Sequence, residues 1–277
     1  MSRSEQLTIT IDDKVCSAEK GEFLLDVAKR NGIFIPTICR SNGLEGLGAC
    51  RMCIVEVSQP PRPGAATVAP ARTRVVTSCI YPVESEIVVA TQSARIKEMR
   101  GLIITFLAKL APDSELIANM ARYMGVDLPR LQPASDDGGK CILCGRCVTA
   151  CEQVGTGAIA KVNRGITKLI ATPYEQPSAE CIGCTACANI CPTGAISCVH
   201  DERSVTIWDK TFTYLTCANC GKPFATPEQY EFIKGKSKAD LVGQRLDARP
   251  PLCDECEKRL VGRSLAVSAQ DYDKARD

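Results

Sequence analysis

Histidine, aromatic side chains and net charge are all scarce in this chain of 277 residues. It has one histidine, His200, and 5% aromatic residues, and its 34 Lys and Arg almost balance its 32 Asp and Glu. A single histidine excludes a cluster held by a histidine pair and a His-rich zinc hydrolase site, and it leaves a Ser-His-Asp triad only with His200 as its base. The net charge of +2 is spread without a basic stripe, so we predict no nucleic-acid partner.

Long apolar runs are missing as well. The longest, Leu102 to Ala108, is interrupted by Thr105 and is far short of the roughly 20 residues that span a membrane. The first residues, MSRSEQLTITIDDK, lack the apolar core of a secretion signal. We therefore expect a cytoplasmic protein with no direct membrane insertion.

Cysteine, in contrast, is abundant, with 18 residues. Thiols of an intracellular chain stay reduced, and so many of them usually serve as metal ligands. A disulfide scaffold is the alternative, but it is typical of short secreted chains, whereas these cysteines fall at regular two-residue gaps. The pattern favours metal binding.

Two cysteine blocks share the spacing C-x2-C-x2-C-x3-C: Cys141, Cys144, Cys147, Cys151 and Cys181, Cys184, Cys187, Cys191. This spacing is typical of bacterial ferredoxins with two [4Fe-4S] clusters, in which the fourth Cys of each block ligates the other cluster. The rule predicts one cluster on Cys141, Cys144, Cys147 and Cys191, and a second on Cys181, Cys184, Cys187 and Cys151. Gly145 and Gly183 leave room for backbone N–H groups to turn toward sulfur. Two zinc sites are the alternative, but zinc uses CxxC pairs rather than a repeated run of four.

A further group, Cys39, Cys50, Cys53 and Cys79, surrounds a glycine-rich loop at residues 41–48. Glycines let the main chain wrap closely around a flat two-iron cluster, so these cysteines are predicted to hold a [2Fe-2S] cluster. The spacing C-x10-C-x2-C is longer than the plant ferredoxin spacing, which makes a plant-type carrier a poor match. Buried thiols packed as small hydrophobic residues are the alternative.

A last group near the end of the chain consists of two CxxC pairs, Cys217, Cys220, Cys253 and Cys256. Four thiolates in two such pairs are common in structural zinc sites, and we predict one Zn²⁺ here. A rubredoxin-like iron or a further iron–sulfur cluster uses the same ligands. Cys16 and Cys198 remain, and both are predicted to be buried thiols.

The hydrophobic periodicity predicts the elements around these groups. Alternating Leu7, Ile9 and Ile11 before Asp12-Asp13 indicate a β-hairpin, and residues 22–30 indicate a helix that ends at Asn31-Gly32. From residue 93 the apolar residues recur at the spacing of a helix. They predict one apolar helix face, made of Ile96, Met99, Leu102, Ile103, Phe106, Leu107 and Leu110. Arg95, Lys97 and Arg100 are predicted to lie on the solvated face.

Together these patterns predict an α+β multidomain protein with four parts. They are a β-grasp [2Fe-2S] ferredoxin domain (1–92), a helical spacer and linker (93–139), a bacterial 2[4Fe-4S] ferredoxin domain (140–200) and a small zinc-ribbon-like C-terminal module (201–277). No catalytic residue stands out.

Four tracts carry a family resemblance. Residues 35–39 (IPTIC), 48–57 (GACRMCIVEV) and 77–79 (TSC) resemble the N-terminal [2Fe-2S] domain of the large iron–sulfur subunit of respiratory complex I. The same module occurs in the diaphorase small subunit of NAD-reducing hydrogenases and in iron-only hydrogenases. Residues 141–148 (CILCGRCV) are similar to that family too, so the resemblance covers about residues 1–200.

The resemblance implies a function and partners. The chain would be a non-catalytic electron-transfer subunit of a hetero-oligomeric oxidoreductase. It would relay electrons between a flavin subunit that uses NAD(P)H and a catalytic subunit such as a hydrogenase or formate dehydrogenase. A free-standing ferredoxin-type carrier with exchangeable partners is the alternative, and a zinc-dependent regulator that senses redox state through its clusters is another.

The chain departs from the family in one place. Members usually hold a [4Fe-4S] cluster on one His and three Cys between the two modules, but residues 80–140 contain neither residue type. We therefore expect that cluster to be missing. Either the fold brings the remaining clusters close together, or a cluster of a partner subunit bridges them.

Overall fold

The computed structural model describes residues 5–41, 43–44, 46–59, 73–128, 139–237 and 250–260. Most of the predicted linker, residues 129–138, lies outside this part of the chain. The chain divides into two compact units. Unit 1 comprises Met1–Ala150, Lys161–Ile170 and Asn189–Ala195, and unit 2 comprises Cys151–Ala160, Ala171–Ala188 and Ile196–Asp277.

Unit 1 begins with the predicted hairpin. Strands β1 (Gln6–Ile11) and β2 (Lys14–Glu19) pair antiparallel, with Ile11 opposite Lys14. Asp12 and Asp13 form the two-residue turn at φ 46° and 67°, the left-handed backbone that matches the twist of a hairpin. The prediction for this segment is confirmed.

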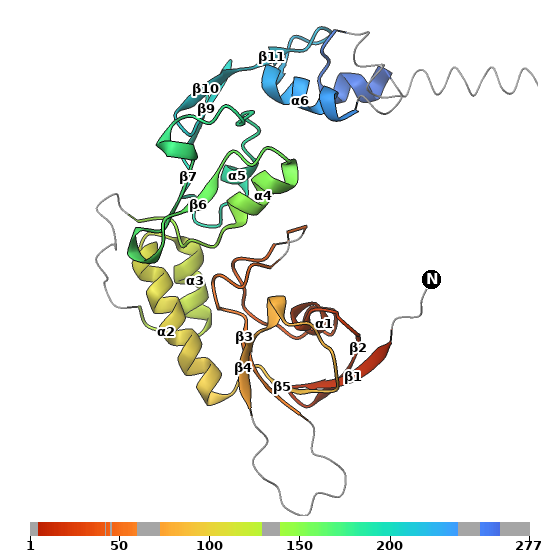
Figure 1. Ribbon diagram of the computed structural model, residues 1–277, viewed down its shortest axis with the longest axis vertical. Helices are drawn as coiled ribbons and strands as arrows, with labels where there is room; N and C mark the ends of the chain where they lie inside the picture. The colour runs from red at the N-terminus through yellow and green to blue at the C-terminus, as the bar shows by residue number, and fades with distance from the viewer. Residues whose placement is uncertain are drawn as a thin grey trace, which may run out of the picture. The chain divides into compact units, whose positions relative to one another are not determined.

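A five-stranded sheet with one helix against it forms the core of this region (Figure 1). Its order is β2-β1-β5-β3-β4, with β3 at Ile54–Ser58, β4 at Arg74–Thr77 and β5 at Val88–Ala90. β1 and β5 are parallel, and the other pairs are antiparallel. Helix α1 (Leu24–Arg30) ends at Asn31, as predicted, and buries Leu24 and Val27 against the sheet. This topology is that of the predicted β-grasp roll.

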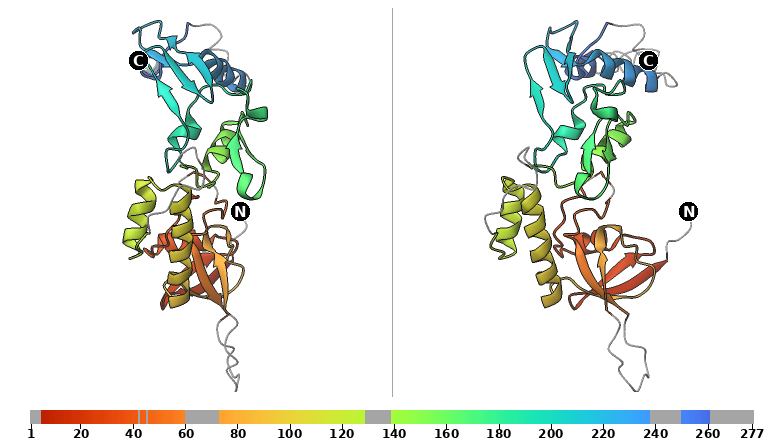
Figure 2. Two further views of the ribbon diagram at one scale, coloured as in Figure 1. Left: turned by 90° about the vertical axis from the view of Figure 1, so that its left-hand side faces the viewer. Right: turned by 60° about the vertical axis from the view of Figure 1, so that its left-hand side comes forward.

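Two helices follow, α2 (Ala94–Leu110) and α3 (Glu115–Tyr123), which lie side by side (Figures 1 and 2). The predicted buried face of α2 is partly wrong: Leu102 and Phe106 are 58% and 68% exposed. Of the predicted positions, Ile96 and Leu107 are buried, and Arg100, Ile104 and Ala108 are buried in addition. Ile104, Leu107 and Ala108 pack with α3 and with the segments around Cys39 and Cys144, so the helix turns its small and branched residues inward.

Arg100 differs most clearly from the prediction, because it is buried rather than solvated, at 3% exposure. Its guanidinium donates to the carbonyl oxygens of Thr91 (3.0 Å) and Ile54 (2.7 Å). Burial lowers the pKa of this side chain. Arg100 therefore ties α2 to the start of β3, beside Cys53.

The other helices and strands of the region up to residue 195 are short. The third Cys of each block is the second residue of a helix, α4 (Arg146–Val154) or α5 (Ala186–Asn189). Other elements are η1 (Ser78–Ile80), β6 (Ala160–Val162), η2 (Gly165–Thr167), β7 (Leu169–Ala171) and η3 (Pro173–Glu175). β6 pairs with β7.

In unit 2, a three-stranded sheet has the order β10-β9-β8. The sheet contains residues from both sides of the predicted domain boundary at residue 200. Its strands are β8 (Cys198–His200), β9 (Ser204–Ile207) and β10 (Lys210–Thr213). β11 (Leu215–Thr216) then pairs with β12 (Pro223–Ala225), and α6 (Pro227–Ser237) follows. Among the described residues, no helix is long and apolar enough to cross a membrane.

The burial of Ile104 and the exposure of Leu102 on α2 lead to a prediction about stability. Ile104→Ala removes a side chain that is 0% exposed and should lower the free energy of unfolding by about 2 to 5 kcal/mol. Leu102→Ala, on the same helix, should change it by less than about 0.5 kcal/mol. Denaturant unfolding of the two variants measures the difference, and equal destabilisation would contradict the assignment of the face.

Candidate metal centres

Four thiols of unit 1 lie near the start of β3. Cys39, Cys50, Cys53 and Cys79 are each 2% exposed or less. Hydrogen bonds with the thiols of Cys50 and Cys79 lower the pKa of Cys39. Hydrogen bonds with the thiols of Cys39 and, as the second cause, Cys53 raise the pKa of Cys79. Pairing with Cys79 lowers the pKa of Cys53 to about 7. These contacts link the four thiols in the series Cys50–Cys39–Cys79–Cys53 at one site.

Gly46 and Gly48 of the glycine-rich loop lie close to Cys79 and to its chain neighbours. A Cβ added at Gly46 would lie 2.8 Å from the Cys79 carbonyl oxygen and 3.1 Å from its Sγ. Gly48 has φ +61°, a conformation that side chains disfavour. Ser78 Oγ donates to the Cys53 carbonyl (2.8 Å) and fixes the neighbouring turn. A buried group of four thiols with main chain close to sulfur fits the predicted [2Fe-2S] cluster.

A second group in unit 1 consists of Cys141, Cys144, Cys147 and Cys191. Burial raises the pKa of Cys147 to about 12, with the charges of Cys144, Cys141 and Cys191 adding to the shift. Backbone N–H groups point at sulfur: Leu143 donates to Cys141 Sγ (3.4 Å) and Ala195 to Cys191 Sγ (3.2 Å). N–H donors toward thiolate sulfur are what iron–sulfur clusters require of a protein.

The third group lies in unit 2 and consists of Cys151, Cys181, Cys184 and Cys187. Burial raises the pKa of Cys187 to about 11, while the indole N–H of Trp208 opposes the shift, at 3.5 Å from Sγ. Ala158 N–H donates to Cys151 Sγ (3.2 Å). The charge of Cys151 acts on the thiols of both Cys181 and Cys187.

The grouping of these eight thiols follows the crossed pattern. Cys191 lies in unit 1 with the first three cysteines, and Cys151 lies in unit 2 with the second three. The glycines behave as expected: Gly145 and Gly183 have φ +78° and +71°. A Cβ at Gly183 would meet the Phe212 ring at 2.8 Å. Ligation itself stays a prediction, but the donor sets fit two cubane clusters.

Within unit 1, the loop of the first cubane group touches the loop of the [2Fe-2S] group. Arg146, next to Cys147, donates to the carbonyl oxygen of Ile38, next to Cys39 (3.4 Å). Ile38, Cys39, Cys50, Met52, Ile142 and Cys144 share one hydrophobic cluster with buried residues of α2 and α3. Helices α2 and α3 thus pack both loops into one core.

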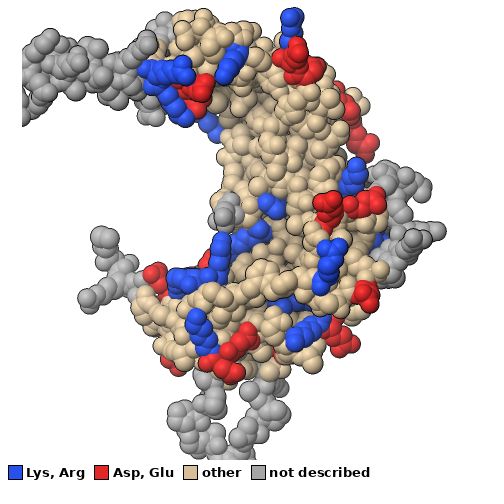
Figure 3. Space-filling view, turned by 180° about the vertical axis from the view of Figure 1, so that it is seen from behind, with Lys and Arg blue, Asp and Glu red and all other residues tan. Residues whose placement is uncertain are grey.

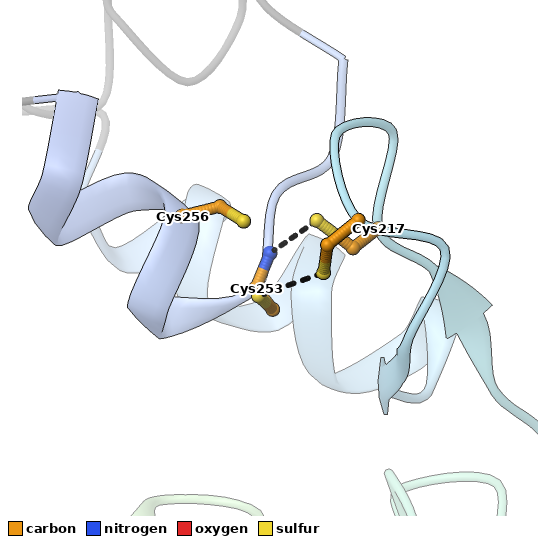
Figure 4. Close-up of side chains that lie close together, drawn as sticks. Cys217, Cys253 and Cys256 are labelled. Carbon is orange, nitrogen blue, oxygen red and sulfur yellow. Dashed lines mark hydrogen bonds between the residues drawn. The ribbon is translucent and has the colours of Figure 1, made fainter.

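The C-terminal cysteines form the most compact group (Figure 4). The Sγ atoms of Cys217, Cys220, Cys253 and Cys256 all lie within 4.8 Å of one another. Those of Cys220 and Cys253 are 3.7 Å apart, close to the about 3.8 Å that Zn–S bonds of about 2.3 Å give in a tetrahedron. Cys253 N–H donates to Cys217 Sγ (3.3 Å) and lowers the pKa of Cys217 to about 6. A thiolate favoured at neutral pH fits a metal ligand.

The two leftover cysteines differ from each other. Cys16 is 2% exposed in the core of the β-grasp sheet, so the prediction of a buried thiol is confirmed. For Cys198 it is wrong, because this side chain is partly exposed and its Sγ lies 3.3 Å from His200 Nε2. His200 Nδ1 in turn lies 2.7 Å from the hydroxyl of Tyr214.

Three residues at these centres were not predicted from the sequence. Arg100 lies beside Cys53, while Trp208 and Lys210 lie beside the group in unit 2. None of them belongs to a ligand motif. The one signal in the sequence was that Trp208 is the single tryptophan of the chain.

Comparison with known proteins agrees with the geometry. Residues 4–94 match the family model of a 2Fe-2S iron-sulfur cluster binding domain, and residues 140–195 match that of a 4Fe-4S dicluster domain. The NADP-reducing hydrogenase subunit HndD of Solidesulfovibrio fructosivorans is 34% identical over 69% of this chain and 36% of its own length. The alpha subunit of a NADPH-Fe(3+) oxidoreductase from Geobacter sulfurreducens is 30% identical over 85% of this chain and 29% of its own.

A subunit of the NADH-quinone oxidoreductase of Rhizobium meliloti is 28% identical over 78% of this chain and 27% of its own length. This chain therefore spans about a third of the length of these relatives. A solved NAD+-reducing [NiFe]-hydrogenase contains a chain with the same fold, with a TM-score of 0.56 at 24% identity. The match covers 68% of this chain and 86% of that one.

The three thiol groups make a spectroscopic prediction. Cys79→Ser should remove or shift only the EPR signal of the two-iron cluster, because its thiol contacts only those of the first group. Cys191→Ser should instead damage one cubane signal, that of the cluster on Cys141, Cys144 and Cys147. EPR spectra of the dithionite-reduced variants test both. Loss of a cubane signal in Cys79→Ser with the two-iron signal intact would show that the ligand sets are wrong.

Proposed function

Because the chain belongs, over residues 4–195, to the iron–sulfur subunits of the complex I and NAD(P)-linked hydrogenase family, we propose that it relays electrons inside a larger oxidoreductase. In this proposal one [2Fe-2S] and two [4Fe-4S] clusters supply one-electron redox chemistry. The chain's own residues hold them, exclude water and set their potentials. The chain itself has no catalytic role.

The observation that carries the proposal is the contact between two cluster loops. Electron transfer slows steeply with distance, and the histidine-ligated cluster that would shorten the path has no ligands here. The Arg146–Ile38 hydrogen bond and the shared core of unit 1 support a direct step from the [2Fe-2S] site to the first cubane site. Within the chain, the proposed path needs no bridging cluster from a partner.

The next step follows from helix α4. It carries both Cys147, a proposed ligand of the first cubane, and Cys151, a proposed ligand of the second. Residues four apart lie on the same face of a helix, one turn from each other. One short helix therefore supplies a ligand to each cubane, as in bacterial two-cluster ferredoxins.

The proposed partners are a flavin subunit that uses NAD(P)H and a catalytic subunit such as a hydrogenase or formate dehydrogenase, in the cytoplasm. Charge supports a stable subunit over a freely exchanging carrier. A strongly acidic surface would favour transient docking, whereas acidic and basic residues are interspersed on the face of unit 1 in Figure 3. The C-terminal four-thiol site is proposed to hold structural Zn²⁺ in a zinc-ribbon-like module, which spans residues 201–277.

The proposal is tested in the native complex. In gel filtration of a cell extract, the chain should elute with its partners, and Cys53→Ser should lower NAD(P)H-linked turnover at least tenfold while leaving that elution unchanged. Cys16→Ser, which changes a buried thiol outside the clusters, should retain turnover. A monomer in the extract would contradict the fixed subunit. Release of the partners on cluster loss would favour redox sensing instead.

A further inference from the structure

The turn between β9 and β10 holds an unusual residue. Trp208 and Asp209 join the strands as a two-residue turn, with Ile207 opposite Lys210. Both turn residues have positive φ, 52° and 57°. Asp is common at such a position, but a bulky aromatic residue there is an outlier. Strained positions of this kind persist where the surrounding structure fixes them, which is often at functional sites.

The tryptophan is directed at a proposed cluster ligand. Its indole Nε1–H donates to Cys187 Sγ at 3.5 Å. Trp208 is only partly exposed, so this donor acts where water is partly excluded. An N–H bond to a ligand sulfur stabilises negative charge on the cluster and its thiolates.

Two residues further on, Lys210 adds a positive charge to the same centre. Its Nζ lies 2.9 Å from the Cys181 carbonyl oxygen and 3.3 Å from that of Ser178. It also lies 4.7 Å from the centre of the Phe212 ring. Burial raises the pKa of the Cys181 thiol, and the charge of Lys210 opposes that shift.

The hairpin is fixed firmly against the ligand loop. Phe212 is 1% exposed and packs over Gly183, where a Cβ would lie 2.8 Å from the ring. Thr226, which is 0% exposed, donates from Oγ1 to the carbonyl oxygen of Ile182 (2.5 Å). The distances from Trp208 and Lys210 to the cysteines are therefore set by packing.

We propose that the β9–β10 hairpin raises the reduction potential of the second cubane through the Trp208 indole N–H and the Lys210 ammonium group. Reduction adds one electron to the cluster, and a donor and a cation beside its ligands stabilise the more negative state. The hairpin lies beyond the part of the chain that matches the dicluster model, residues 140–195, and contacts the ligand loop of only one of the two cubane groups. The proposal rests on the proposed function, since it requires a cluster on Cys151, Cys181, Cys184 and Cys187.

Conservative variants of the full-length, anaerobically purified protein test the proposal. Trp208→Phe keeps an aromatic ring and loses the N–H, and Lys210→Met keeps the aliphatic stem and loses the charge. In an EPR-monitored redox titration, each should move the midpoint of one cubane to a more negative potential and leave the other cubane unchanged. The affected cubane should be the one whose signal changes in Cys181→Ser.

Tyr214→Phe is the matched control, because it removes a donor from another aromatic ring, whose partner is His200. It should leave both cubane midpoints unchanged. Unshifted midpoints in Trp208→Phe and Lys210→Met, or an equal shift of both cubanes, would overturn the proposal. Absence of cubane signals from the unsubstituted protein would instead contradict the proposed function.

A second measurement needs no substitution at the hairpin. Because Trp208 is the only tryptophan, all indole fluorescence of the protein reports on this site. An iron–sulfur cluster in contact range quenches an indole, so emission should be weak in the cluster-loaded protein. It should rise several-fold in Cys181→Ser but not in Cys79→Ser. Strong emission from the loaded protein would show that the indole is not at the cluster, and would overturn the proposal even if Trp208→Phe failed to fold.

Discussion

Every centre in this chain depends on holding four thiolates together, although like charges repel and burial favours the neutral thiol. The raised pKa values of Cys147 and Cys187 show that cost before any metal is considered. Backbone N–H groups aimed at sulfur, as at Cys141 and Cys191, reduce it. Glycines at left-handed positions make the close approach of main chain to sulfur possible. In the proposed function, bound iron or zinc would supply the remaining stabilisation.

The sequence predicts those features that depend on residues close together along the chain, and it misses those that depend on tertiary packing. The hairpin at Asp12-Asp13 depends on neighbouring residues and agrees with the structure. The spacing of the cysteines is equally local, and the ligand sets that it indicates stay predictions. The inward face of α2 depends on what packs against it, and for this reason Leu102 and Arg100 were misassigned. The contact of Trp208 with Cys187 joins residues that are 21 positions apart in the sequence, and no sequence motif links them. No periodicity could predict it.

The helices between the two cluster-binding regions share one core with the loops that carry the thiols. The buried side chains of α2 and α3 join the Cys39 and Cys144 loops in one hydrophobic core, in a stretch of sequence that contains neither His nor Cys. Arg100 anchors this pair of helices to β3, and Arg146 ties the two loops directly. The spacer thus acts as a structural bridge, and the electron path that we propose runs beside it.

The central claim is that the thiolates hold three iron–sulfur clusters and one zinc. Iron, acid-labile sulfide and zinc analysis of anaerobically purified protein tests it most directly. We predict about ten irons, about ten sulfides and about one zinc per chain. A colourless protein without acid-labile sulfide, even after reconstitution, would contradict the claim.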